Sequence, residues 1–245
     1  INETVSMEDP VTSKIVLSYD IEIPVMGVIT INKNIDQSKL TLNYLTKLML
    51  KQFIHMLGFY YDYYAFPGII VEGDKDGEYN IDIIDDFGNE RELKVIQYAR
   101  EYFNCPTIER IPIVVNEDGT LHWPSRLFLG ELMADIEYSE EQVISKFTLL
   151  YLEDLKVFRV KDYSGGLMRF GKNKGCHFFE NPCGDKIENE EDKYAFSNEF
   201  YLPIENTNNP EPSCSSGRLS KTIYKLEPIE PDEEKCEYNL NEYGG

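Results

Sequence analysis

The sequence lacks a long hydrophobic run. No stretch reaches the roughly 18 consecutive apolar residues that a membrane-crossing helix needs, so we expect no transmembrane segment in this chain. Positive charge is also scarce, because 24 Lys and Arg residues face 44 Asp and Glu residues, a formal net charge of −20. Such acidity disfavours nucleic acid and anionic membrane surfaces as partners.

The chain also lacks an initiating methionine, a signal peptide and any internal repeat. Because it begins at Ile1, we expect a processed product or a trimmed segment of a longer protein. What is present favours a folded protein, since 42% of the residues are hydrophobic and 13% are aromatic. The length of 245 residues allows one large domain or two small ones.

Cysteine is absent from the first 104 residues and then occurs five times, at Cys105, Cys176, Cys183, Cys214 and Cys236. This clustering predicts an extracellular region stitched by disulfides. Reduced thiols in a cytosolic protein are the alternative. The odd count leaves at least one cysteine free or paired outside this chain.

The first part of the chain predicts strands followed by a helix. Residues 13–23 and 26–35 are rich in Val, Ile and Tyr and are separated by Pro24, which indicates two strands. Apolar residues at helical spacing predict a helix over 36–59. Asp36 or Ser38 would cap its start, and Gly58 would stand just past its end.

The middle of the chain predicts one or two hairpins and two further helices. Short β-prone runs between residues 68 and 91 are separated by "DKDG" and "DFGN", which we interpret as turns; the first lacks part of the ligand spacing of a calcium loop. Residues 92–103 and 140–158 predict helices, the second with apolar Val143, Phe147, Leu150 and Leu155. A shift to Gly, Asn, Pro, Cys and Glu predicts a subdomain boundary near residues 160–170.

The stretch "LMLKQFIHMLGF" has the frame of a zinc-protease helix with two substitutions. In His-Glu-x-x-His, two histidines one turn apart bind one zinc ion, and the glutamate is the general base for the zinc-bound water. Here the frame reads Lys51, Gln52 and then His55, and Gly58 follows. A lysine ammonium has no lone pair for a metal, and a glutamine cannot take a proton from water.

Several stretches together are similar to one protein family. "VMGVITIN", "FIHMLGF", "AREYFNCPTIERIPI", "HWPSRLFLGELMADI" and "LMRFGKNKGCHFFENPC" occur in an order and at spacings that resemble the leishmanolysins, zinc metallopeptidases of the metzincin group. The resemblance covers roughly residues 22 to 183. The separation of 122 − 55 = 67 residues between two histidines suits the long insertion of that family.

The resemblance implies roles for individual residues. His55 would be the second zinc ligand and His122 the third, with Lys51 replacing the first ligand and Gln52 the catalytic base. Met133 would be the Met-turn methionine, whose alternative is an ordinary core methionine. We hypothesise that Lys51 bridges the two histidines by hydrogen bonds in place of the metal; in the alternative, Lys51 turns to solvent and the site relaxes.

The resemblance also implies a fold, which is α+β and metzincin-like with a disulfide-stitched, loop-rich second subdomain. Residues 1–60 would hold the end of the upper subdomain with the active-type helix. Residues 61–165 would hold the insertion, the third-histidine and Met-turn region and the second helix, and residues 166–245 a cysteine-bearing lower subdomain. Because little chain precedes the helix, a missing N-terminal segment or a companion chain would complete the upper sheet.

The family's disulfide pairing would join Cys105 to Cys176 and Cys183 to Cys236, leaving Cys214 over. Spacing alone also allows Cys183 to pair with Cys214. Disulfides and family membership imply a secreted or cell-surface protein.

The expected function is that of a leishmanolysin-like pseudopeptidase that binds a protein or peptide partner, with no cofactor and no catalytic residue. One alternative is an active zinc metalloendopeptidase with a non-standard site, for which His177, next to Cys176, would be a poor replacement ligand. Another is a structural component of a larger extracellular assembly.

Overall fold

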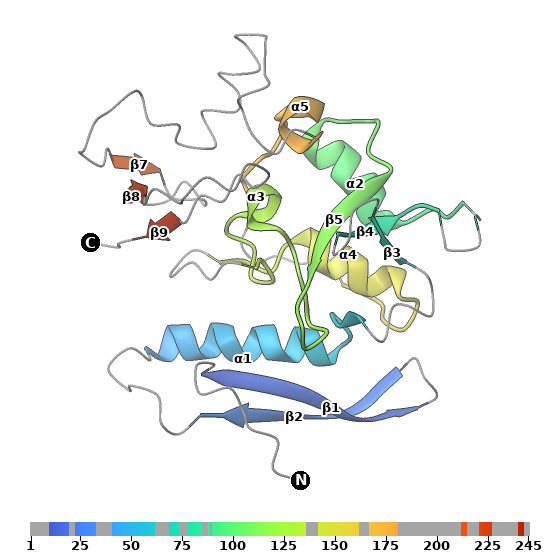
Figure 1. Ribbon diagram of the computed structural model, residues 1–245, viewed down its shortest axis with the longest axis vertical. Helices are drawn as coiled ribbons and strands as arrows, with labels where there is room; N and C mark the ends of the chain where they lie inside the picture. Colours follow the sequence, from blue (N-terminus) through green and yellow to red (C-terminus); the bar gives the residue numbers. More distant parts are fainter. Residues whose placement is uncertain are drawn as a thin grey trace.

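The computed structural model of the chain is shown in Figure 1. It describes residues 10–19, 23–32, 41–61, 69–73, 78–84, 88, 90–135, 142–161, 167–180, 212–214, 221–226 and 240–242. The described residues include both helices and strands, so the fold is α+β. Within them, none of the helices combines the length and apolar character needed to cross a bilayer.

The chain begins with an antiparallel hairpin of β1 (Val11–Tyr19) and β2 (Ile23–Ile31). The prediction of two strands is confirmed, but the prediction that Pro24 separates them is wrong. Pro24 lies inside β2 opposite Ser18. A proline is tolerated there because β2 is an edge strand among the described residues, so its missing N–H can fall on the side without a partner.

Helix α1 (Leu42–Met56) begins later than predicted. Its N-cap is Thr41, whose Oγ1 accepts a hydrogen bond from the Tyr44 N–H at 3.2 Å. The expected caps Asp36 and Ser38 lie outside the described residues. Gly58 follows the helix end as predicted, with φ of 119°, a conformation that side chains rarely adopt. In Figure 1, α1 lies between the β1–β2 hairpin and the rest of the molecule.

A second sheet follows in the order β3-β4-β5-β6, with antiparallel neighbours throughout. Its strands are β3 (Ile70–Glu72), β4 (Tyr79–Asp82), β5 (Arg110–Val115) and β6 (Leu121–His122). The β3–β4 pair confirms the predicted hairpin, although the "DKDG" turn at 74–77 lies outside the described residues. Of "DFGN", only Gly88 is described.

The remaining helices are α2 (Lys94–Phe103), α3 (Ser125–Phe128), α4 (Lys146–Asp154) and α5 (Gly175–Glu180). Helix α2 agrees with the prediction. Helix α4 is shorter than the predicted 140–158, because Val143 instead forms a bridge with Glu131 and is therefore not part of any helix. Three short strands, β7 (Pro212–Cys214), β8 (Lys221–Leu226) and β9 (Leu240–Glu242), form an antiparallel sheet.

An aromatic core joins these elements. Six of its large side chains are almost fully buried: Phe59, Phe103, Trp123, Phe128, Phe147 and Tyr151. The indole Nε1–H of Trp123 donates to Thr148 Oγ1 on α4 at 2.8 Å, so the one polar atom of this ring is satisfied. The core therefore packs the segment after β6 against α2 and α4.

The disulfide predicted between Cys105 and Cys176 is confirmed, and it ties the end of α2 to α5. Cys183 and Cys236 lie outside the described residues, so their pairing stays a prediction. Phe178 of α5 stacks on Phe103 of α2, which shows that α5 shares the core of the preceding segment. The predicted subdomain boundaries stay a prediction.

Candidate functional site

Helix α1 and strand β6 bring together the residues that the sequence singled out. Lys51 and His55 stand one turn apart on α1, and His122 ends β6. The rings of His55 and His122 meet edge to face, with centroids 5.0 Å apart and an interplanar angle of 83°. All three side chains are buried, with relative exposures of 7% for Lys51, 3% for His55 and 7% for His122. We call these three residues the histidine–lysine cluster.

Lys51 points into the protein. Its Nζ donates a hydrogen bond of 3.1 Å to the main-chain carbonyl oxygen of Ala134, the residue after Met133. The alternative in which Lys51 turns to solvent is therefore wrong for this structure. The hypothesis that Lys51 bridges the two rings by hydrogen bonds stays a prediction, and in this structure the ammonium donates to a backbone carbonyl in the segment that holds Met133.

His55 is neutral and its ring is oriented by the backbone. Its Nδ1 lies 2.9 Å from the carbonyl oxygen of Phe59. Because a carbonyl can only accept, Nδ1 carries the proton and Nε2 keeps its lone pair. Burial, and then the charge of Lys51, lower the pKa of His55 from 6.5 to about 4, against the opposing effect of the Phe59 hydrogen bond.

The ring of His122 is contacted by a residue of the turn between β5 and β6. Its Nδ1 lies 3.1 Å from Nδ2 of Asn116. Burial, then the charge of Lys51 and then that of His55, together lower the pKa of His122 from 6.5 to about 2. Both imidazoles are thus neutral at physiological pH.

Gln52, at the position of the catalytic base, contacts the hairpin. The Ser13 hydroxyl of β1 donates a hydrogen bond of 2.6 Å to Gln52 Oε1. This bond occupies the amide oxygen and links α1 to β1, while Lys51 and His55 lie on the buried face of the helix.

Met133 is fully buried beside a carboxylate that the sequence reasoning missed. Its N–H donates to Glu131, which is also fully buried. Glu131 further accepts from the N–H and hydroxyl of Ser145, both at 3.0 Å, and from Thr148 Oγ1 at 2.6 Å. Burial raises the pKa of this carboxyl, and the hydrogen bonds oppose the rise. The available signal was a glutamate inside the otherwise apolar "LFLGELMA".

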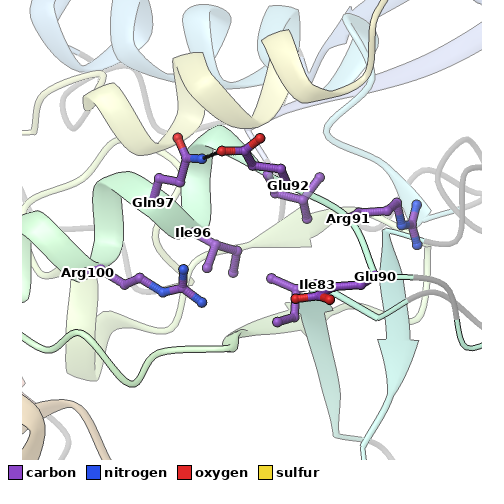
Figure 2. A pocket seen from close by; sticks show the side chains of 8 residues that line it. Ile83, Glu90, Arg91, Glu92, Ile96, Gln97 and Arg100 are labelled. Atoms are coloured by element: carbon purple, nitrogen blue, oxygen red, sulfur yellow. Dashed lines mark hydrogen bonds between the residues drawn. The ribbon is translucent and has the colours of Figure 1, made fainter.

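A separate pocket of about 350 Å³ lies beside α2 (Figure 2). Figure 2 shows Arg100 and Ile96 of α2 on one side and Ile83, just past β4, on the other. Glu90, Arg91, Glu92, Leu93 and Gln97 complete the lining. No residue of the histidine–lysine cluster lines this pocket.

Comparison with known proteins identifies related chains. The "Leishmanolysin-like peptidase" of Caenorhabditis briggsae is 28% identical over 114 residues, which are 44% of this chain and 17% of that protein. The protein of the same name from Caenorhabditis elegans is 28% identical over 115 residues, again 44% and 17%. The "Leishmanolysin homolog" of Crithidia fasciculata is 27% identical over 168 residues, 65% of this chain and 24% of that protein.

The matched regions thus span between 17% and 24% of the length of these relatives. A family model described as Leishmanolysin matches residues 13–231, nearly the whole of this chain. The match includes α1, β6, the Met133 segment and both disulfide cysteines. The chain belongs to the leishmanolysin family, which has a metallopeptidase fold and is normally zinc-dependent.

Proposed function

We propose that this chain is a leishmanolysin-like pseudopeptidase, an extracellular or cell-surface protein that binds a protein or peptide and lacks a working zinc site. The observation that carries the proposal is the buried Lys51 ammonium, bonded to the Ala134 carbonyl at the position of the first ligand. The disulfide between Cys105 and Cys176 supports a setting outside the reducing cytosol.

The residues of the cluster do not fit a catalytic zinc ion. Such an ion takes three protein ligands and keeps an open position for water. His55 and His122 are two nitrogen donors, whereas the Lys51 ammonium carries only N–H donors and repels a cation. We therefore derive no metal-dependent step for this chain.

General-base chemistry is missing as well. Gln52 keeps the shape of a glutamate but not its basicity, and general-base catalysis contributes about 10²–10⁴-fold to a reaction rate. Its amide oxygen is already the acceptor of the Ser13 hydroxyl. Restoring a metal alone would therefore leave the site impaired.

Binding without chemistry has a structural basis in the β1–β2 hairpin. Among the described residues, each of these strands pairs only with the other, so the sheet has two outer edges. Val16, Met26 and Val28 on it are each about half exposed, at 52%, 50% and 49%. An extended peptide, a companion chain or an additional segment of a longer chain could add to such an edge by main-chain hydrogen bonding.

The test compares the natural chain with a Lys51→His, Gln52→Glu double variant for zinc content and for cleavage of unstructured peptides. We expect no zinc and no cleavage in the natural chain, and recovered zinc in the double variant. A Lys172→His variant is the control, because Lys172 is exposed. Stoichiometric zinc in the natural chain, or cleavage abolished by a chelator, would contradict the proposal.

The second candidate is an active metallopeptidase with a non-standard site. It is favoured by family membership and by the retained contact of His55 with His122. It requires a replacement ligand and a base from elsewhere, and cleavage by the natural chain would establish it. A purely structural role in an assembly would instead leave the hairpin edge unimportant for partner binding.

A further inference from the structure

We propose that Asn116 holds His122 in the tautomer with its proton on Nε2, which makes this histidine a weaker metal ligand whatever residue stands at position 51. The inference rests on the proposed function, a chain without a working zinc site, and adds a second cause for the weak metal binding. Its own test, however, reads a proton position and does not depend on zinc content.

The argument begins at Thr120. Its hydroxyl has a single hydrogen, and Asp118 Oδ1 lies 2.6 Å away. A carboxylate only accepts, so the Thr120 hydroxyl is the donor in that bond. The Thr120 N–H donates to the same carboxylate oxygen at 2.9 Å, which holds the turn in place.

The Thr120 oxygen is consequently an acceptor toward its other neighbour. That neighbour is Asn116, whose side-chain nitrogen Nδ2 lies 3.2 Å from Thr120 Oγ1. If the Asn116 amide were flipped, its Oδ1 would face the Thr120 hydroxyl oxygen. That hydroxyl has no hydrogen left to donate, because it donates to Asp118. The network therefore orients the amide with its NH₂ group toward Thr120.

The same NH₂ group lies 3.1 Å from Nδ1 of His122. An amide nitrogen donates two hydrogens and accepts none, so Nδ1 of His122 must be the acceptor. In the neutral ring the proton then resides on Nε2. A chain of hydrogen bonds thus runs from His122 through Asn116 and Thr120 to Asp118. Because the Asp118 carboxylate can only accept, it sets which atom donates in each of these bonds.

The two histidines are therefore opposite tautomers, with the proton on Nδ1 in His55 and on Nε2 in His122. A metal-bound histidine almost always donates its second ring N–H to a carbonyl, a carboxylate or water. His55 has this arrangement through the Phe59 carbonyl, whereas His122 has the reverse. To offer Nε2 to a metal, His122 must move its proton to Nδ1, and Asn116 must turn its oxygen toward that nitrogen. The Asn116 Oδ1 and Thr120 Oγ1 atoms would then face each other without a hydrogen between them.

Nitrogen NMR of the natural chain is the direct test. The sequence contains only three histidines, so ¹⁵N-histidine labelling gives a simple two-bond ¹⁵N–¹H spectrum that His→Gln variants assign. We expect His122 protonated at Nε2 and His55 protonated at Nδ1. A His122 ring protonated at Nδ1 would overturn the inference, whatever the zinc content of the chain.

Zinc titration of substituted chains is the second arm. In the Lys51→His, Gln52→Glu background, Asn116→Asp replaces the donor with an acceptor, and we expect zinc affinity to rise by about 10–100-fold. Thr120→Val frees the amide to turn and should raise the affinity as well. Asn104→Asp adds the same charge outside the cluster and should not. Equal affinities with and without the Asn116 change, in chains with equal melting temperatures, would overturn the inference.

Discussion

The Nζ atom of Lys51 lies 3.1 Å from the carbonyl oxygen of Ala134, a hydrogen bond between residues 83 positions apart in the sequence. The bond joins the buried face of α1 to the segment that holds Met133. A metal bound by histidines would instead join α1, which carries His55, to β6, which carries His122. Lys51 thus links α1 to the Met133 segment with its own side chain.

Removing this link should destabilise the protein. We expect Lys51→Met to lower the free energy of unfolding by about 1–3 kcal/mol, because the buried Ala134 carbonyl loses its charged donor. Urea unfolding followed by fluorescence measures the change. Lys172→Met, at an exposed position, should stay within about 0.5 kcal/mol of the natural chain. A Lys51→Met chain of unchanged or greater stability would show that the ammonium is not a structural link.

The free energy of unfolding should decrease as the pH is lowered, because the buried histidines are neutral in the folded chain. Folding lowers the pKa of His55 from 6.5 to about 4, so the unfolded chain takes up this proton first as the pH falls. The stabilising contribution is therefore fully present above about pH 6.5 and is lost progressively toward pH 4, by about 3 kcal/mol for His55. His122, with a pKa of about 2, continues the loss below that range.

Urea unfolding at a series of pH values tests this dependence. A His55→Gln variant should show a shallower decline between about pH 6.5 and pH 4. If the natural chain and the variant declined in parallel, the loss would come from other groups.

Helix α2 should depend on a carboxylate from another helix. Its N-cap Leu93 makes no side-chain cap bond, and Asp154 at the end of α4 instead accepts from the N–H groups of Lys94 and Val95 at 3.0 and 2.9 Å. We expect Asp154→Ala to lower the free energy of unfolding by about 1–2 kcal/mol, the range of a lost cap. Thermal and urea unfolding measure it.

The neighbouring residue supplies the control for this prediction. Glu153 forms an ion pair of 2.6 Å with Lys94, whose side chain is 50% exposed. Exposed pairs contribute about 0–1 kcal/mol, so Glu153→Ala should have a much smaller effect. Similar losses in the two variants would contradict the capping role of Asp154.

The Cys105–Cys176 bond should stabilise the junction of α2 and α5. Replacing both cysteines with alanine should lower the free energy of unfolding by about 2–4 kcal/mol, since the bond closes a long loop. Peptide mapping under non-reducing conditions first verifies the pairing. An unchanged melting temperature in the double variant would mean that the packing of Phe178 on Phe103 alone holds α5.

Local sequence patterns predicted the elements whose signals are local. The β1 and β2 strands, the β3–β4 hairpin and α2 follow from runs of β-branched residues, turn residues and helical periodicity. The start of α1 at Thr41 and the shortening of α4 did not follow. Thr41 competed with other capping residues nearby, and Val143 was drawn out of the helical pattern by its bridge to Glu131, a tertiary contact.

By itself the sequence determined the family resemblance, the replacement of ligand and base by Lys51 and Gln52, and the identity of His55 and His122 as the remaining pair. Only the tertiary structure decided where the Lys51 ammonium goes, that Glu131 gathers four donors beside Met133, and that Asn116 faces His122 with its amide nitrogen. The physical reason is that residue types set which atoms can donate or accept. Which donor meets which acceptor depends on segments far apart in the chain, and their packing is a property of the whole fold.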